Sequence, residues 1–182
     1  MTGFLLALVA TFLAGFGARD QVLVAGLAAR NGARPALLLT GLLTSAFAAA
    51  GAVWLAGGFA PQLAPAARRM LAVLALAVAA LEMIVVQPKA PLNEPTQSLG
   101  ATGLVLLAQQ ITDAARFLLF AIVTASVLPL AAGLGGAFGS MAVVATGWMA
   151  GDALLRLPLV QIRRALGAAL LLAAGAFYLA LR

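Results

Sequence analysis

The sequence contains neither cysteine nor histidine. The lack of cysteine excludes disulfides, thiol chemistry and thiolate metal sites. The lack of histidine removes the commonest metal ligand and the side chain that most often carries protons near neutral pH. No potential nucleophile has a base within motif distance. We therefore expect no enzymatic activity and no cofactor.

Charge is also scarce. Charged residues make up only 9% of the 182 residues, whereas a soluble domain carries about 25%. Hydrophobic residues account for 64%, and the mean hydropathy is +1.11. This composition predicts an all-α integral membrane protein with no separate soluble domain. The net charge of +6 comes from basic residues that stand singly or in pairs, mostly at the ends of apolar runs, which indicates membrane topology rather than nucleic-acid binding.

The apolar runs define the expected helices. A membrane-spanning helix needs about 20 apolar residues, and by this measure the chain has six such helices, at about 3–29, 36–57, 70–86, 101–127, 131–150 and 165–181. Between the third and fourth runs lies the only sustained polar stretch, where Pro88, Pro91 and Pro95 forbid a helix. The expected organisation is a three-helix repeat over residues 1–86, a Pro-rich cytoplasmic linker over 87–100 and a second three-helix repeat over 101–182.

Similar residues recur at a nearly constant distance. The offset is 94 residues for Pro35 and Pro129, Trp54 and Trp148, and Gly57 and Gly151; it is 95 for Gly17 and Thr112 and for the Arg68-Arg69 and Arg163-Arg164 pairs. This pattern predicts a gene duplication. Each half has an odd number of helices, so the second half must be inserted upside down. Inverted repeats are typical of secondary transporters, whose sites lie near the midplane at the repeat interface.

Basic residues in the connections predict the orientation. The linker side carries Arg30, Arg34, Lys89, Arg156, Arg163 and Arg164, and the other side carries Arg68, Arg69 and Arg182. Cytoplasmic loops carry the excess of basic residues. We therefore expect a multi-pass protein of the cell inner membrane, with the linker in the cytoplasm and both termini outside.

Two polar clusters interrupt the apolar runs, one in the first run and one in the fourth. A charged side chain at such depth costs about 2.5–3.5 kcal/mol on insertion scales, so it faces the bundle interior and pairs or works there. The first cluster holds Arg19, Asp20 and Gln21. The second holds Gln109, Gln110, Thr112, Asp113 and Arg116. The spacing of Gln109, Thr112, Asp113 and Arg116 predicts one stripe on the fourth helix.

Two interpretations of these clusters stay open. In the first, a substrate or ion path is lined by Asp20, Gln21, Gln109, Gln110, Thr112 and Asp113. In the second, a buried ion-pair network joins the repeats, with Asp20 meeting Arg116 and Arg19 meeting Asp113. Glu82, near the end of the third helix, is either a proton carrier or a side chain that reaches the membrane interface. Gly133, Gly135, Gly136 and Gly139 of the fifth helix are predicted packing positions, because no strand precedes them as in a nucleotide-binding loop.

The clusters read Gly15-Phe16-Gly17-Ala18-Arg19-Asp20-Gln21 and Gln110-Ile111-Thr112-Asp113-Ala114-Ala115-Arg116. They resemble the motif Glu-x-Gly-Asp-Lys/Arg-Thr/Ser-Gln, which opens both three-helix repeats of the Gdt-type cation/proton exchangers, a family that includes transmembrane protein 165-like proteins and bacterial manganese exporters. Gly17, Arg19 and Gln21 match in the first copy and Asp113 in the second. Gly15, Ala18 and Gln110 stand where the family has acids. The resemblance implies an antiporter that exchanges manganese or calcium for protons, with Asp20 and Asp113 as metal ligands.

The charge balance departs from that family. Two intact motifs give a site with a net charge of −2, whereas Asp20 and Asp113 face Arg19 and Arg116 here, for a net charge of zero. A calcium ion takes about six or more oxygen ligands, so this balance predicts altered or lost ion binding. One alternative is a non-transporting membrane scaffold or partner subunit. Another is a transporter of a small anionic or zwitterionic solute held by Arg19 and Arg116. The expected partners are the lipid bilayer, a small cation and, as one option, a second copy in a homodimer, without nucleic acid.

Overall fold

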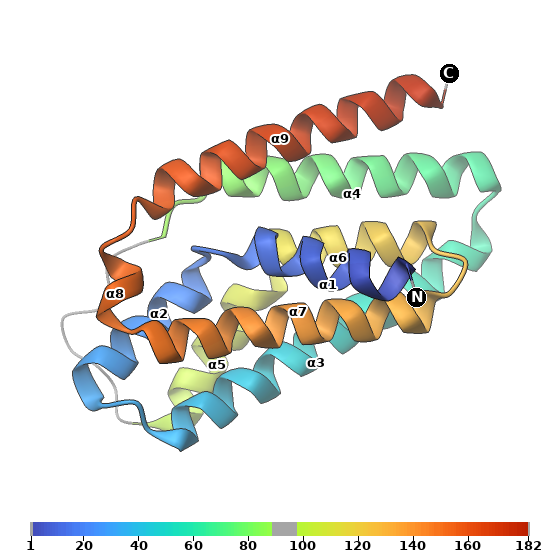
Figure 1. Ribbon diagram of the computed structural model, residues 1–182. Coiled ribbons are helices and arrows are strands. Elements are labelled where there is room, and N and C mark those ends of the chain that lie inside the picture. Colours follow the sequence, from blue (N-terminus) through green and yellow to red (C-terminus); the bar gives the residue numbers. More distant parts are fainter. Residues whose placement is uncertain (1, 89–97, 182) are drawn as a thin grey trace.

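The computed structural model describes residues 2–88 and 98–181, and the secondary structure of these residues is entirely helical. The helices are α1 (Thr2–Gly15), α2 (Arg19–Asn31), α3 (Pro35–Phe59), the 3-10 turn η1 (Ala60–Gln62), α4 (Pro65–Val85), α5 (Leu99–Ile111), α6 (Ala114–Ala125), α7 (Pro129–Ala150), α8 (Asp152–Leu155) and α9 (Leu159–Ala180) (Figure 1). The predicted all-α class is confirmed for the described residues. Linker positions 89–97, including Lys89, Pro91 and Pro95, lie outside them.

Proline sets the start of three long helices. Pro35, Pro65 and Pro129 stand at the beginning of α3, α4 and α7, where a missing backbone N–H costs nothing. Helix α4 therefore begins at Pro65 rather than near residue 70. Helix α9 begins directly after Pro158, so the predicted loop before the last helix is wrong and Arg163 is helical.

Several helices are long and apolar enough to cross a membrane. They are α3 with η1, α7 and α9, and each of the bent pairs α1–α2 and α5–α6 also qualifies when taken as one span, which gives up to five among the described residues. Helix α4 has 21 residues, but every 18-residue stretch of it contains Arg68, Arg69 and Glu82. Charge rather than length thus sets α4 apart from the other candidates. Large apolar side chains cover the outer surface, including Leu5, Leu39, Phe47, Leu134 and Leu172, as lipid contact requires.

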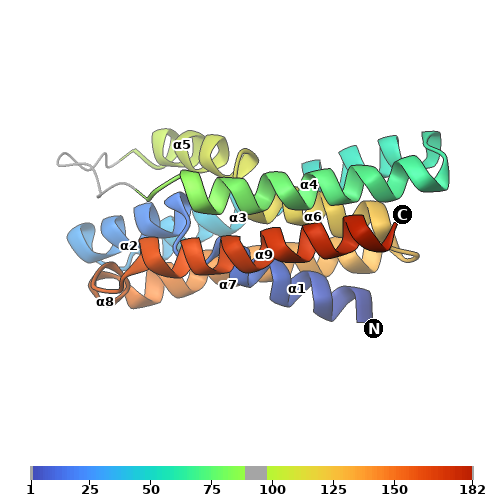
Figure 2. The ribbon, with the colours of Figure 1, turned by 90° about the horizontal axis from the view of Figure 1, so that it is seen from above.

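The long helices lie side by side in layers (Figures 1 and 2). Helices α4 and α9 form an antiparallel pair, and α6 packs beneath α4. The start of α1 and the end of α9 lie at one end of the bundle, while the end of α4 and the start of α5 lie at the opposite end (Figure 1). Packing is unequal between the halves: α4 contacts α6 extensively, but the corresponding pair in the 94–95 residue repeat, α9 and α2, hardly touches.

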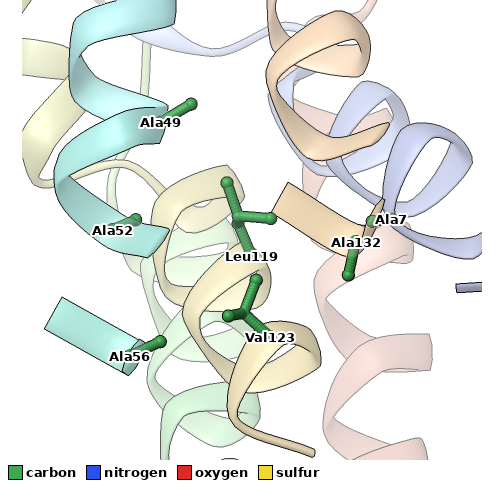
Figure 3. Packing of buried hydrophobic residues seen from close by; sticks show 7 residues of the cluster. All are labelled: Ala7, Ala49, Ala52, Ala56, Leu119, Val123 and Ala132. Carbon is green, nitrogen blue, oxygen red and sulfur yellow. The ribbon is translucent and has the colours of Figure 1, made fainter. Parts of the chain in front are cut away.

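The core consists mainly of small residues. Leu119 and Val123 of α6 project between α3 and the α1–α7 pair (Figure 3). The other fully buried members of this cluster are all alanines, namely Ala7, Ala49, Ala52, Ala56 and Ala132. Small residues let helix backbones approach closely in a membrane, where tight packing replaces the hydrophobic effect as the source of association.

Glycine brings α1 and α7 into backbone contact. A Cβ atom at Gly135 would overlap the Phe4 carbonyl, and one at Gly139 would overlap the Leu8 carbonyl and the Thr11 hydroxyl. The Thr11 hydroxyl lies 3.2 Å from the Gly136 carbonyl, to which it can donate across the same interface. The prediction that these glycines are packing positions is confirmed.

Candidate functional site

The first polar cluster lies at a break in the chain rather than inside one helix. Helix α1 ends at Gly15, α2 begins at Arg19, and the two are bent by 66°. Gly17 has φ +70°, a left-handed conformation that glycine adopts without steric penalty. Its amide donates to Gln21 Oε1 at 2.7 Å, which ties the break to the first turn of α2. The prediction of one continuous helix over 3–29 is therefore wrong.

The second cluster lies at the equivalent break. Helices α5 and α6 are bent by 52°, and Asp113 caps α6 by accepting a hydrogen bond from the Ala115 amide at 3.3 Å. Aspartate is a favoured N-cap because its carboxylate satisfies a free amide of the first turn. The predicted helix over 101–127 is thus two helices. Gln109 and Arg116 lie on different helices, so the predicted single stripe is wrong.

Each break places a carboxylate at the start of a half-helix. Asp113 caps α6, while Asp20 lies in the first turn of α2 and accepts from the Gln21 amide at 2.8 Å. Both aspartates are buried, with 5% exposure. The N-terminal end of a helix is partially positive and stabilises an anion. The helix starts therefore help to stabilise two buried carboxylates, in addition to any stabilisation by basic side chains.

The charged centre consists of Arg19, Asp20, Asp113 and Arg116 from the two clusters and of two residues from outside them. These two are Glu82 of α4 and Arg163 of α9. Arg163 Nη2 lies 2.6 Å from Glu82 Oε2 and 3.8 Å from Asp113 Oδ1. Arg19 Nη2 lies 3.8 Å from Glu82 Oε1. Glu82 is only 8% exposed, so the interpretation that it reaches the membrane interface is wrong. Arg163 is 1% exposed and was expected to be a topology signal in a loop; it joins α4, α6 and α9 instead.

The predicted partners of the two cluster arginines are not the observed ones. Arg116 donates to Ser140 Oγ and, at 3.2 Å, to Ser45 Oγ, and no ion pair joins it to a carboxylate within the described part of the chain. Asp20 Oδ2 accepts from Gln110 Nε2 at 3.0 Å. The Asp20–Arg116 pair is therefore not formed. Ser45 and Ser140 are 95 residues apart, so both repeats contribute equivalent hydroxyls to this guanidinium.

Arg19 differs from its predicted role as well. It donates to Thr112 Oγ1 at 3.1 Å and pairs with Glu82 rather than with Asp113. Its side chain is 30% exposed, and Thr112 is exposed beside it. The charged centre therefore reaches the molecular surface at Arg19 and Thr112.

The other predicted path residues divide between this centre and the helix packing. Gln110 is buried and holds Asp20, while Gln109 is half-buried on the same helix. Gln21 turns away and donates to the Val143 carbonyl and the Thr146 hydroxyl, both at 3.0 Å. Gln21 therefore fastens α2 to α7 instead of lining a path with Asp20.

The centre is neutral in charge but incomplete in hydrogen bonding. Asp20, Glu82 and Asp113 balance Arg19, Arg116 and Arg163. Four buried acceptor atoms make no hydrogen bond, namely Glu82 Oε1, Asp113 Oδ1, Gln109 Oε1 and Gln110 Oε1, and the Nε atoms of Arg116 and Arg163 are also unpartnered. A buried polar atom without a partner costs about 1–3 kcal/mol. The centre thus has free acceptor capacity for a proton, a water molecule or a cation.

The acids do not form a metal site as they are arranged here. No group of three or more acidic, cysteine or histidine side chains that could hold a metal ion occurs in residues 2–88 and 98–181. Arg163 stands between Glu82 and Asp113, two of the three acids. The assignment of Asp20 and Asp113 as metal ligands stays a prediction.

Comparisons of this chain with protein-family models, curated proteins and solved structures found no match. The fold and the site define a helical protein with membrane-length apolar helices and a buried, charge-balanced centre at two chain breaks. The resemblance to Gdt-type exchangers remains a prediction that rests on the two motif copies, each of which lies at one of these breaks.

Proposed function

We propose that the protein is a secondary transporter of the inner membrane that exchanges a small cation, with manganese or calcium as first candidates, for protons. The observation that carries this proposal is a set of four buried acceptor oxygens without donors. Three of them belong to Gln109, Gln110 and Asp113 at the α5–α6 break, and the fourth belongs to Glu82 of α4. Oxygens that lack donors are satisfied by a cation or by a proton on one of the carboxylates. An anionic substrate would add further acceptors to a place where the four unpartnered acceptor atoms already outnumber the two unpartnered arginine Nε donors.

The proposed architecture has six spans, with α4 as the sixth. Arg68 and Arg69 lie in its first turns, near one end of the bundle. Its remaining charge, Glu82, is neutralised by Arg163. Paired in this way, α4 can cross the membrane although its sequence alone is too charged to resemble a span.

The proposed repeats are inverted. The α1–α2 pair runs from the end of the bundle where α1 starts and α9 ends toward the opposite end, and α5–α6 runs in the reverse direction (Figure 1). Discontinuous helices in equivalent positions of two inverted repeats are characteristic of secondary transporters, in which they build the binding site. The unequal packing of α4–α6 and α9–α2 is the kind of asymmetry by which one conformation of such a carrier closes one side more than the other.

Cation flux is the direct test. The purified protein in proteoliposomes should take up Mn²⁺ or Ca²⁺ when a proton gradient is imposed. Glu82→Gln and Asp113→Asn should each lower this flux on the order of tenfold or more. A tenfold loss corresponds to a rise of about 1.4 kcal/mol in the activation free energy of transport. Asp152→Asn is a matched control because this carboxylate is exposed and lies outside the centre. Uptake of amino acids alone would favour the zwitterion transporter, and absence of any flux would favour the scaffold.

The inverted topology has its own test, which the lack of cysteine simplifies. Ala33 and Val127 are exposed, lie in connections between helices and are 94 residues apart. A membrane-impermeant maleimide added to intact cells should label Val127→Cys but not Ala33→Cys. Ala33→Cys should be labelled once the cytoplasmic side is made accessible to the reagent. Leu157→Cys should behave like Ala33→Cys. Labelling of Ala33→Cys and Val127→Cys from the same side would contradict the inverted repeat.

The burial of Arg163 changes the basis for the orientation. The linker side keeps Arg30, Arg34, Lys89, Arg156 and Arg164, against Arg68, Arg69 and Arg182 on the other. The excess is smaller but has the same sign. The cytoplasmic side therefore stays the linker side in the proposal.

A further inference from the structure

We propose that Arg163 acts as a tethered cation, which occupies the place of the transported cation in this conformation and must be displaced when that cation binds. This inference rests on the proposed function. It concerns which residue competes with the substrate and therefore sets the affinity and selectivity of the site.

The position of the guanidinium is the first argument. Arg163 reaches from the second turn of α9 to Glu82 on α4 at 2.6 Å and to Asp113 at the start of α6 at 3.8 Å. Its Nη1 donates to the Ala14 carbonyl at 3.4 Å. It is among the largest side chains that the structure buries completely. One positive group thus lies among a carboxylate from each repeat and a backbone carbonyl.

The end of α1 is the second argument. Because α1 stops at Gly15, the amides that follow do not continue its hydrogen bonds. The Ala18 amide donates to the Gly15 carbonyl instead of the Ala14 carbonyl. This end of a helix is partially negative and favours a cation. In carriers with broken helices, such ends together with unwound backbone coordinate the coupling ion. Here the Ala14 carbonyl is bound by Arg163 instead.

The third argument is that the guanidinium fills the site only in part. Glu82 Oε1 and Asp113 Oδ1 make no hydrogen bond although both residues flank Arg163. Without the guanidinium, Glu82 Oε2, Asp113 Oδ1 and the Ala14 carbonyl would lose the positive group that now lies against them. These are hard oxygen ligands of the type that manganese and calcium prefer. The centre thus has oxygen ligands suited to a cation, but Arg163 lies where the cation would be and prevents these oxygens from converging on it.

The other basic residues do not fit this role. Arg116 is held by two serine hydroxyls, and Arg19 is partly exposed and 3.8 Å from its acid. Arg68, the repeat equivalent of Arg163, donates to the Ala60 carbonyl in η1, the 3-10 turn before α4. Only the second repeat supplies an arginine to the centre from its last helix.

Mn²⁺ binding to the purified protein, measured by electron paramagnetic resonance of the free ion, tests this inference. Arg163→Gln removes the competitor and should lower the Kd by about tenfold or more. Arg163→Lys should also bind more tightly than the wild type, by a smaller factor, because a strongly hydrated ammonium competes less well than a guanidinium fork. The lysine variant keeps a positive charge beside Glu82, so it serves if the glutamine variant fails to fold. Arg164→Gln is the control, because its side chain is exposed, and its Kd should equal that of the wild type.

The outcomes separate this inference from the proposed function. Unchanged or weaker binding in the folded Arg163 variants, with cation flux intact in the wild type, would overturn the inference alone. Equal tightening in the Arg164 variant would overturn it too, since general loss of positive charge would then be the cause. Absence of both Mn²⁺ binding and cation flux in every variant would overturn the inference together with the proposed function.

Discussion

Replacing Glu82 by glutamine or Arg163 by glutamine should each destabilise the detergent-solubilised protein by about 3–5 kcal/mol, because either change leaves a buried charge without its partner. The two side chains are 2.6 Å apart, with 7% and 2% of their surfaces exposed. In the double variant neither charge remains, so most of the lost stability should return. Unfolding in detergent, followed by circular dichroism against denaturant, would give the four free energies of this double-mutant cycle.

The matched cycle uses the neighbouring arginine. Arg164 is exposed and lies beside the side-chain amide of Gln87. Arg164→Gln should cost little alone and should add to Glu82→Gln within about 0.5 kcal/mol, as expected for side chains that share no contact. A coupling energy near zero for Glu82 and Arg163 would show that the observed ion pair does not hold α4 to α9.

The second large effect is expected at the contact between α1 and α7. Gly135→Ala and Gly139→Ala should each destabilise by about 1–3 kcal/mol, the range for overpacking a tight core. The added methyl groups would meet backbone carbonyl groups of Phe4 and Leu8, and a backbone cannot rotate away as a side chain can. The same unfolding measurement applies.

Two glycines of α3 provide the control for these variants. Nothing lies within 4 Å of a Cβ atom at Gly51 or Gly57. Alanine at either position should leave stability unchanged or raise it slightly through higher helix propensity. Equal losses of stability at all four positions would mean that any glycine-to-alanine change in these helices is destabilising, whether or not the glycine lies at the α1–α7 contact.

The sequence predicted the helical class and the packing glycines because both depend on composition along one helix. It did not predict the two chain breaks, because apolar residues continue on both sides of each break and hydropathy averages over them. Local signals were nevertheless present. Gly17 is suited to a left-handed turn, and Asp113 directly precedes Ala114 as an N-cap residue would.

The sequence predicted that buried ion pairs would form but not which residues form them. The bend of 66° between α1 and α2 changes the direction of the α2 side chains. The helical period of the first apolar run therefore could not predict which way Arg19 and Asp20 point. Arg163 gave no signal at all, since an Arg-Arg pair before an apolar run has the same appearance at positions 68–69 and 163–164. One of these arginines enters the core through contacts with residues far away in the chain.

The pairing of Glu82 with Arg163 also constrains how the chain is assembled in the membrane. Helix α4 ends the first half of the protein, whereas α9 is made only after four further helices, α5 to α8. Each carries a charge that is costly in lipid by itself, and the shortest ion pair of each charge is with the other. In the proposed six-span architecture, α4 therefore cannot reach its final depth at low cost until α9 has been made, so packing of α9 against α4 stabilises the final arrangement of the bundle. A chain truncated before Leu159 is expected to remain incompletely inserted and to be accessible to membrane proteases.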